Sequence, residues 1–255
     1  MFIPLHDANS LKHISAQYVT IALIAANVIV FLLTSVGSEQ TVQAAVVGLG
    51  YIPATIYDFA ARGPAQIWVP DYATYITYMF LHGDIWHLGG NMLFLWVFGD
   101  NVEDALGHLK FLIFYLLCGI AGAFLHGIVA PDSTAPLIGA SGAIAGIVSA
   151  YLFLHPRVRI WVLAFGRIPL RIPAWLVLAL WIAFQLVMFF GAGDEQISWA
   201  AHVGGIIAGV VLVLVMRRRN VSLFDAEVVT PRAAQVRTPW TPPEPPPPSQ
   251  RWGRQ

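Results

Sequence analysis

Apolar residues are gathered in six long runs along this chain. A helix needs about 20 predominantly apolar residues to cross the hydrocarbon core of a membrane, and roughly 17 to 25 are tolerated. Each run has about this length. The runs cover residues 17–36, 87–104, 109–129, 138–154, 173–191 and 199–216. The pattern therefore predicts six transmembrane helices.

The basic residues between these runs predict an orientation in the membrane. Four arginines lie between the fourth and fifth runs, and Arg217–Arg219 follow the sixth. The alternate loops "APDSTAP" and "AGDEQIS" contain no basic residue. Since cytoplasmic loops carry an excess of lysine and arginine, we expect both termini in the cytoplasm. The long connection 37–86 is then expected on the outer side, as a partly interfacial covering loop.

The composition agrees with a membrane protein. Of 255 residues, 57% are hydrophobic and only 11% are charged, whereas soluble domains carry roughly 25% charged residues. The net charge of zero gives no support for a nucleic-acid partner. The single cysteine, Cys118, cannot form an intramolecular disulfide. We therefore expect an all-α protein with the lipid bilayer as its surroundings.

Three segments are expected along the chain. Residues 1–16 form a cytoplasmic N-terminal segment, and residues 17–218 form the six-span membrane domain. No basic region leads into a cleavable signal at the N-terminus, so the first run is expected to remain as a span. Residues 219–255 end in "PWTPPEPPPPSQRWGRQ" and are expected to form a disordered cytoplasmic tail.

Polar residues recur at one depth in the second, fourth and sixth runs, all of which enter from the outer face. His87 and Asn91 lie four apart in the second run, Ser141 lies in the fourth, and His202 lies in the sixth. At 1.5 Å per residue, each lies roughly 5–10 Å below the outer boundary. Three helices thus present polar groups at a common level.

These residue types are the ones that acyl transfer requires. Ser141 is a weak nucleophile unless a base takes its proton, and His202 is the best candidate for that base. No carboxylate occurs at matching depth, so a two-residue dyad is expected. Asn91, His87 and the backbone N–H of Ser141 could donate hydrogen bonds to the oxyanion.

Glycines around these residues predict close helix packing. The fourth run contains Gly142 and Gly146, and the sixth contains Gly205 and Gly209, both pairs at a spacing of four. A smooth stripe of this kind would let the sixth helix press against the fourth and bring His202 within hydrogen-bond distance of Ser141.

The polar residues also have other interpretations. A lone serine in a membrane helix is more often a packing residue than a nucleophile. The "GAGD" sequence ending at Asp194 resembles a motif of intramembrane aspartyl proteases, but no second membrane aspartate accompanies it. No His-Glu-x-x-His motif is present, so no metal site or other cofactor is expected. A proton-relaying transporter would place its ionisable groups at the bilayer midplane rather than near one face.

Together these motifs resemble the rhomboid family of intramembrane serine proteases. The resemblance covers most of residues 82–216. It rests on "GASG" around Ser141, "AHVGGIIAG" around His202 and "HLGGN" from His87 to Asn91. The family's Gly-x-x-x-Glu-x-x-x-Gly signature with its later tyrosine is matched by Gly99, Glu103, Gly107 and Tyr115.

The resemblance implies a six-helix bundle of rhomboid-like architecture with a cavity open to the outer side. Ser141 would be the nucleophile, His202 the base, and His87 and Asn91 the oxyanion donors. Substrates would be single-span membrane proteins, cleaved near small residues. The expected packing and structural residues are Gly139, Gly142, Gly146, Gly205, Gly209 and Glu103.

Two questions stay open at this point. Some members of the family place an aromatic residue four positions after the serine, stacked on the histidine, and here that position is Ala145. The alternative function is that of a catalytically inactive relative that binds membrane client proteins. The compact chain suggests a bacterial plasma membrane as its location.

Overall fold

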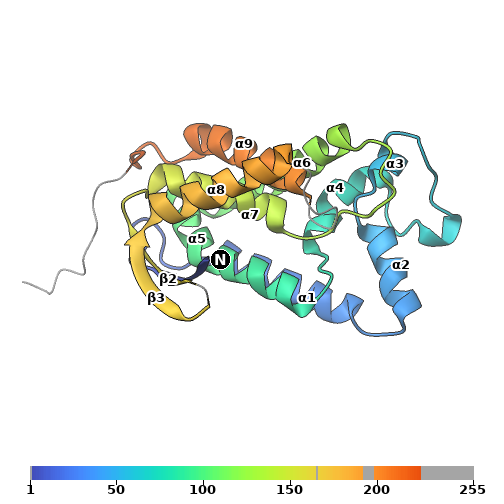
Figure 1. The fold of residues 1–255 in the computed structure, drawn as a ribbon, viewed down its shortest axis with the longest axis horizontal. Helices are drawn as coiled ribbons and strands as arrows, with labels where there is room; N and C mark the ends of the chain where they lie inside the picture. Colours follow the sequence, from blue (N-terminus) through green and yellow to red (C-terminus); the bar gives the residue numbers. More distant parts are fainter. Residues whose placement is uncertain (1, 165, 192–197, 225–255) are drawn as a thin grey trace, which may run out of the picture.

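The computed structural model describes residues 2–164, 166–191 and 198–224. Most of these residues are helical, and one small sheet lies at the opposite end of the molecule from helices α2–α4 (Figure 1). Six helices begin and end within three residues of the apolar runs that predict them. They are α1 (Tyr18–Thr34), α5 (Ile85–Leu106), α6 (His108–Val129), α7 (Ser141–Leu154), α8 (Ala174–Phe190) and α9 (Trp199–Met216).

Two of these helices can cross a membrane by length and composition alone. Within the part of the chain that the structure describes, these are α6 and α9. The helices α1, α7 and α8 are also apolar but shorter, and α7 has only 14 residues. At 1.5 Å per residue α7 is about 21 Å long, against roughly 30 Å for the hydrocarbon core. It is short because residues 135–140 are not helical, so the helix begins only at Ser141.

The connection between α1 and α5 is a folded layer. It contains α2 (Glu39–Leu49), α3 (Pro53–Ile56) and α4 (Thr74–Thr77), with short 3-10 turns at Pro64–Gln66, Asp71–Ala73 and Tyr78–Phe80. Arg62 donates hydrogen bonds to the carbonyl groups of Gly48 and Val69 and pairs with Asp71. Arg62 thus links the end of α2 to the segment at 69–71.

A three-stranded antiparallel sheet corrects the all-α prediction. It consists of β1 (Phe2–Asp7), β2 (Arg159–Ala164) and β3 (Ile168–Pro173), in that order. In β2, Ile160, Val162 and Ala164 are buried, and they alternate with more exposed residues as expected for a strand with one face on the core. The sequence interpretation used the arginines of this region only as orientation signals and so overlooked the alternation.

The helix α7 lies at the centre of the bundle and packs against α5, α6, α8 and α9. Its contact with α9 is made between backbones. A Cβ atom added at Gly205 would lie 1.9 Å from the carbonyl oxygen of Gly142, and one added at Gly209 would lie 2.3 Å from that of Gly146. Only glycine fits at these two positions of α9, and the close approach determines how far α9 stands from α7.

Glu103, near the end of α5, joins that helix to the starts of α1 and α6. The first turn of α1 has no capping side chain at Gln17. Instead, the Glu103 carboxylate accepts hydrogen bonds from the backbone N–H groups of Val19 at 3.0 Å and Thr20 at 2.8 Å. The ring of His108, the first residue of α6, also contacts it at 2.5 Å. A buried carboxylate thus satisfies the free N–H groups at the start of α1.

Candidate active site

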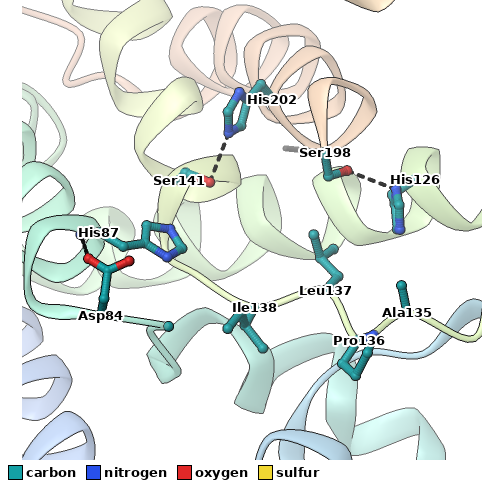
Figure 2. A pocket seen from close by; sticks show the side chains of 11 residues that line it. Asp84, His87, His126, Ala135, Pro136, Leu137, Ile138, Ser141, Ser198 and His202 are labelled. Atoms are coloured by element: carbon teal, nitrogen blue, oxygen red, sulfur yellow. Dashed lines mark hydrogen bonds between the residues drawn. The ribbon is translucent and has the colours of Figure 1, made fainter. Parts of the chain in front are cut away.

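Ser141 and His202 lie side by side at the beginnings of their helices. Ser141 is the first residue of α7, and His202 lies in the first turn of α9. Ser141 Oγ lies 2.8 Å from His202 Nε2. Figure 2 marks this hydrogen bond with a dashed line. The contact between the glycines of α7 and α9 brings these two helix ends together.

The other ring nitrogen of His202 is held by Gln185 of α8. The distance from His202 Nδ1 to Gln185 Oε1 is 2.7 Å, and Gln185 is only 3% exposed. Because a carbonyl oxygen can only accept, Nδ1 carries the ring proton and Nε2 is left to accept from the Ser141 hydroxyl. The rings of Trp181 and Trp199 lie near the imidazole, with centroids 6.3 Å and 5.9 Å away.

Gln185 was missed by the sequence interpretation, although the sequence contains a signal for it. It is the one polar residue in the otherwise apolar run "PAWLVLALWIAFQLVMFFG". A polar side chain within such a run is costly unless it has a partner. Ala145, where some relatives have an aromatic residue, is fully buried.

His87 and Asn91 lie one turn apart on α5, next to the segment that leads into Ser141. A Cβ atom added at Gly139 would lie 2.7 Å from His87 Nε2 and 3.7 Å from Asn91 Nδ2. Gly139 also has φ +116°, a conformation that favours glycine. The amide nitrogen of Asn91 is buried and has no hydrogen-bond partner among the described residues. A donor that is buried without a partner is costly, so this one is available for a bound group.

The start of α5 is fixed by Asp84. Its carboxylate accepts hydrogen bonds from the backbone N–H groups of His87 at 2.9 Å and Trp86 at 2.7 Å, which hold the pKa of Asp84 below its usual range. The ring of His82 packs edge-on against His87, with centroids 5.1 Å apart. Burial lowers the pKa of His82 to about 4, so this neighbour of His87 is uncharged at neutral pH.

A cavity of about 510 Å³ lies beside Ser141 and His202. Ser141, His202, His87 and Asp84 line it, together with residues 135–138. A second histidine–serine pair, His126 and Ser198, also lines it (Figure 2). The cavity thus contains a hydroxyl hydrogen-bonded to an imidazole, with His87 on the same wall. Acyl transfer can use such a set of groups.

Asp194, the residue considered for aspartyl protease chemistry, falls at 192–197, outside the described residues.

Comparison with known proteins identifies a family. The family model of the rhomboid domain matches residues 69–219, more than half of the chain. Over 142 residues the chain is 34% identical to Rhomboid protein 1, mitochondrial, of Saccharomyces cerevisiae. This match covers 52% of this chain and 38% of the yeast protein. Over 155 residues it is 31% identical to the rhomboid protease GluP of Bacillus subtilis. This match covers 61% of this chain and 28% of GluP.

A third relative matches over a longer stretch. The chain is 26% identical over 201 residues to the human presenilin-associated rhomboid-like protein, mitochondrial, covering 76% of this chain and 47% of the human protein. The chain therefore spans less than half the length of each of these three relatives. Two of them are mitochondrial by name, so they do not support the predicted bacterial plasma membrane. The match over residues 69–219 shows that this chain belongs to the rhomboid family.

Proposed function

We propose that this protein is an intramembrane serine endopeptidase in which Ser141 and His202 form the catalytic dyad. The observation that carries this proposal is the 2.8 Å contact between Ser141 Oγ and His202 Nε2 inside a cavity. Gln185 supports the proposal because it leaves Nε2 unprotonated, as a general base requires.

The reaction proceeds in two halves. His202 Nε2 takes the hydroxyl proton as Ser141 Oγ attacks the carbonyl carbon of the scissile peptide bond. The bond from that carbon to nitrogen then breaks, and His202 returns the proton to the leaving amine. In the second half His202 takes a proton from water, the resulting hydroxide attacks the acyl group, and the ester bond to Ser141 breaks as Oγ regains its proton.

In both half-reactions the carbonyl oxygen under attack becomes an oxyanion, and it lies on the α5 side of Ser141. Asn91 Nδ2 is the donor with no other partner among the described residues, and His87 lines the cavity next to it. The backbone N–H of Ser141 belongs to the first turn of α7 and has no partner within the helix. We propose that these three donors stabilise the negative charge that develops on the scissile carbonyl oxygen.

We propose that all six apolar helices span the bilayer. Both termini of the chain then lie in the cytoplasm. The shortness of α7 supports a position of Ser141 below the outer boundary. The cavity would supply the water for the second half-reaction. Substrates are single-span membrane proteins whose helix unwinds near small residues. No metal or other cofactor is part of this mechanism.

A catalytically inactive, client-binding relative is the alternative. Loss of the serine or the histidine marks such proteins. Here both residues are present, hydrogen-bonded and open to a cavity, and this favours the enzyme.

The test is covalent labelling of the purified protein in mild detergent with a fluorescent fluorophosphonate. Labelling is expected for the wild type and lost in Ser141→Ala and His202→Ala. Ser198→Ala is the matched control, because Ser198 is the other cavity serine that contacts a histidine, and it is expected to keep the label. No labelling of a folded wild type would favour the client-binding alternative, and labelling that depends on Ser198 would identify a different nucleophile.

A further inference from the structure

The edge strand β3 leaves part of its inner face uncovered. In the antiparallel register, Leu170 lies opposite Val162 and Ile168 lies opposite Ala164. Residues paired in this way point to the same face of a sheet, and Val162 and Ala164 are buried. Leu170 and Ile168 point the same way, yet they are 39% and 53% exposed. The bundle therefore covers the inner face of β2 but not the first half of β3.

The inner face of the sheet is directed at the ends of α5 and α7. Asp7 of β1 lies opposite Ile160 of β2, so its side chain is on this face. Its carboxylate accepts hydrogen bonds from Asn101 of α5 at 2.9 Å and from Tyr151 of α7 at 2.6 Å. On the proposed topology these helix ends lie at the cytoplasmic side of the membrane. The uncovered side chains of β3 therefore point toward lipid rather than toward the cytosol.

The strand β3 lies at the depth where α8 enters the membrane. It ends at Pro173, and α8 begins at Ala174 with no loop between them (Figure 1). Trp175 in the first turn of α8 is exposed, and tryptophan is enriched at the level of the lipid headgroups. A strand that continues directly into a membrane helix starts from the membrane surface. This places β3 at the headgroup layer.

The surface around β3 is positively charged. Four exposed arginines lie between α7 and α8, namely Arg157, Arg159, Arg167 and Arg171. Among the described residues, no acidic side chain of β1 or of the last two turns of α5 is exposed. Asp7, Glu103 and Asp104 are buried, and Asp100 is half-buried. Such a surface attracts the anionic headgroups of a cytoplasmic leaflet and repels a second copy of itself. The charge thus favours lipid over self-association.

We propose that β3 is an amphipathic strand that binds the anionic lipid surface of the cytoplasmic leaflet. Ile168 and Leu170 enter the boundary between headgroups and acyl chains, as the apolar face of an interfacial helix does. Arg171 lies on the opposite face of the strand, opposite Trp161, and together with Arg167 it pairs with lipid phosphate groups. The inference rests on the proposed topology and not on the catalytic dyad.

The experiment compares two neighbouring positions on opposite faces of β3. Leu170→Cys and Pro169→Cys are each labelled with the environment-sensitive dye NBD. The native Cys118 is buried, so unlabelled wild type is the control for specificity. Each protein is placed in vesicles of three parts phosphatidylcholine to one part phosphatidylglycerol, and in vesicles of phosphatidylcholine alone. Part of the phosphatidylcholine carries a nitroxide quencher near the top of its acyl chain.

NBD at Leu170→Cys is expected to lose about half of its emission to the nitroxide in the anionic vesicles, because an interfacial apolar face lies about 5–10 Å into the headgroup boundary. NBD at Pro169→Cys should lose much less. Adding Arg167→Gln or Arg171→Gln to Leu170→Cys should lower the ratio of quenched to unquenched dye about fivefold for each arginine. Vesicles without phosphatidylglycerol should show a similar loss.

Equal quenching at the two positions would overturn the inference, because β3 would then have no lipid-facing side. Quenching that ignores both phosphatidylglycerol and the arginines would overturn the preference for anionic lipid. A blue shift at Leu170→Cys that grows with protein density and is not accompanied by quenching would show that a second copy covers the strand, which also contradicts lipid binding.

The topology and the proposed function fail separately from the strand. Reaction of Pro169→Cys with a membrane-impermeant maleimide added outside intact cells would overturn the topology and with it the cytoplasmic leaflet as the partner. Absence of fluorophosphonate labelling would overturn the proposed function, while the quenching at Leu170→Cys would be unaffected.

Discussion

Gln185 accepts a hydrogen bond from His202 across the interface between α8 and α9, at 2.7 Å from Oε1 to Nδ1. The imidazole is thus held on one side by an amide and on the other by the Ser141 hydroxyl. An amide carries no charge, so this arrangement fixes the orientation and tautomer of His202 without placing a carboxylate inside the membrane.

Replacing this amide tests its role. Gln185→Met has similar volume but no carbonyl acceptor, so Nδ1 loses its partner and the productive tautomer is no longer favoured. We expect the fluorophosphonate labelling rate to fall about tenfold to a hundredfold, equivalent to about 1.4–2.8 kcal/mol of barrier height. Leu186→Met, one residue further along α8 and 38% exposed, is the control and should label at the wild-type rate. Equal rates in both variants would contradict the role of Gln185.

Asn91 is expected to act mainly on the chemical step. Asn91→Ala removes the buried amide donor that has no partner in the described part of the chain. Loss of one oxyanion donor typically lowers kcat by 10²–10³, with little effect on KM. Steady-state kinetics on a fusion protein with a single transmembrane segment rich in small residues would measure both constants. A rise in KM at constant kcat would instead identify Asn91 as a substrate-binding residue.

The glycines of α9 are expected to determine both stability and site geometry. Gly205→Ala would force a methyl group to within 1.9 Å of the Gly142 carbonyl oxygen, so α9 must move away from α7. We expect a loss of about 1–3 kcal/mol in unfolding free energy and loss of fluorophosphonate labelling.

Gly90→Ala on α5 is the matched control for this substitution. A Cβ atom at Gly90 meets nothing within 4 Å, so the change should be neutral or stabilising by up to about 1 kcal/mol. Thermal unfolding in detergent would measure both variants. Equal stability of the two would show that the contact between α7 and α9 is not tightly packed.

The free energy of unfolding is expected to depend on pH through Asp7 in β1. Burial raises the pKa of Asp7 to about 6 from its usual value of 3.8, although Tyr151 and Asn101 both donate to its carboxylate. Between these two pH values the folded protein holds the proton more tightly than the unfolded chain. The stability contributed by protonated Asp7 is therefore lost as pH rises from about 4 to 6, by up to about 3 kcal/mol.

Asp7→Asn removes this titration. The melting temperature of Asp7→Asn should match the wild type near pH 4 and exceed it by a growing margin up to pH 7. Asp84→Asn should show the opposite trend, because the pKa of Asp84 is lowered and its stabilising contribution is lost as pH falls. Parallel pH profiles for Asp7→Asn and the wild type would contradict the prediction.

The sequence predicted the helices well because a run such as 109–129 has one stable arrangement in lipid, a helix of nearly that length. It also predicted that Ser141 and His202 come within hydrogen-bond distance, since polar groups are conspicuous in apolar runs. Their 2.8 Å contact depends on how Gly205 packs on Gly142, which spacing could suggest but not measure. The role of Gln185 depends on contact with His202 of another helix, which the lone polar position in its run does not specify. The strand β2 completes its sheet with β1, about 150 residues earlier in the chain, so the alternation in β2 alone does not reveal the pairing.

The 14-residue length of α7 also bears on permeability. A cavity that admits water from one side of a bilayer risks conducting protons and ions to the other. On the proposed topology, about 21 Å of apolar helix continues below Ser141, and Ile147, Val148 and Leu154 on this stretch are fully buried among neighbouring helices. If the proposed function holds, hydrolysis is confined to the outer third of the membrane, and the remaining thickness keeps the barrier that a transmembrane ion gradient requires.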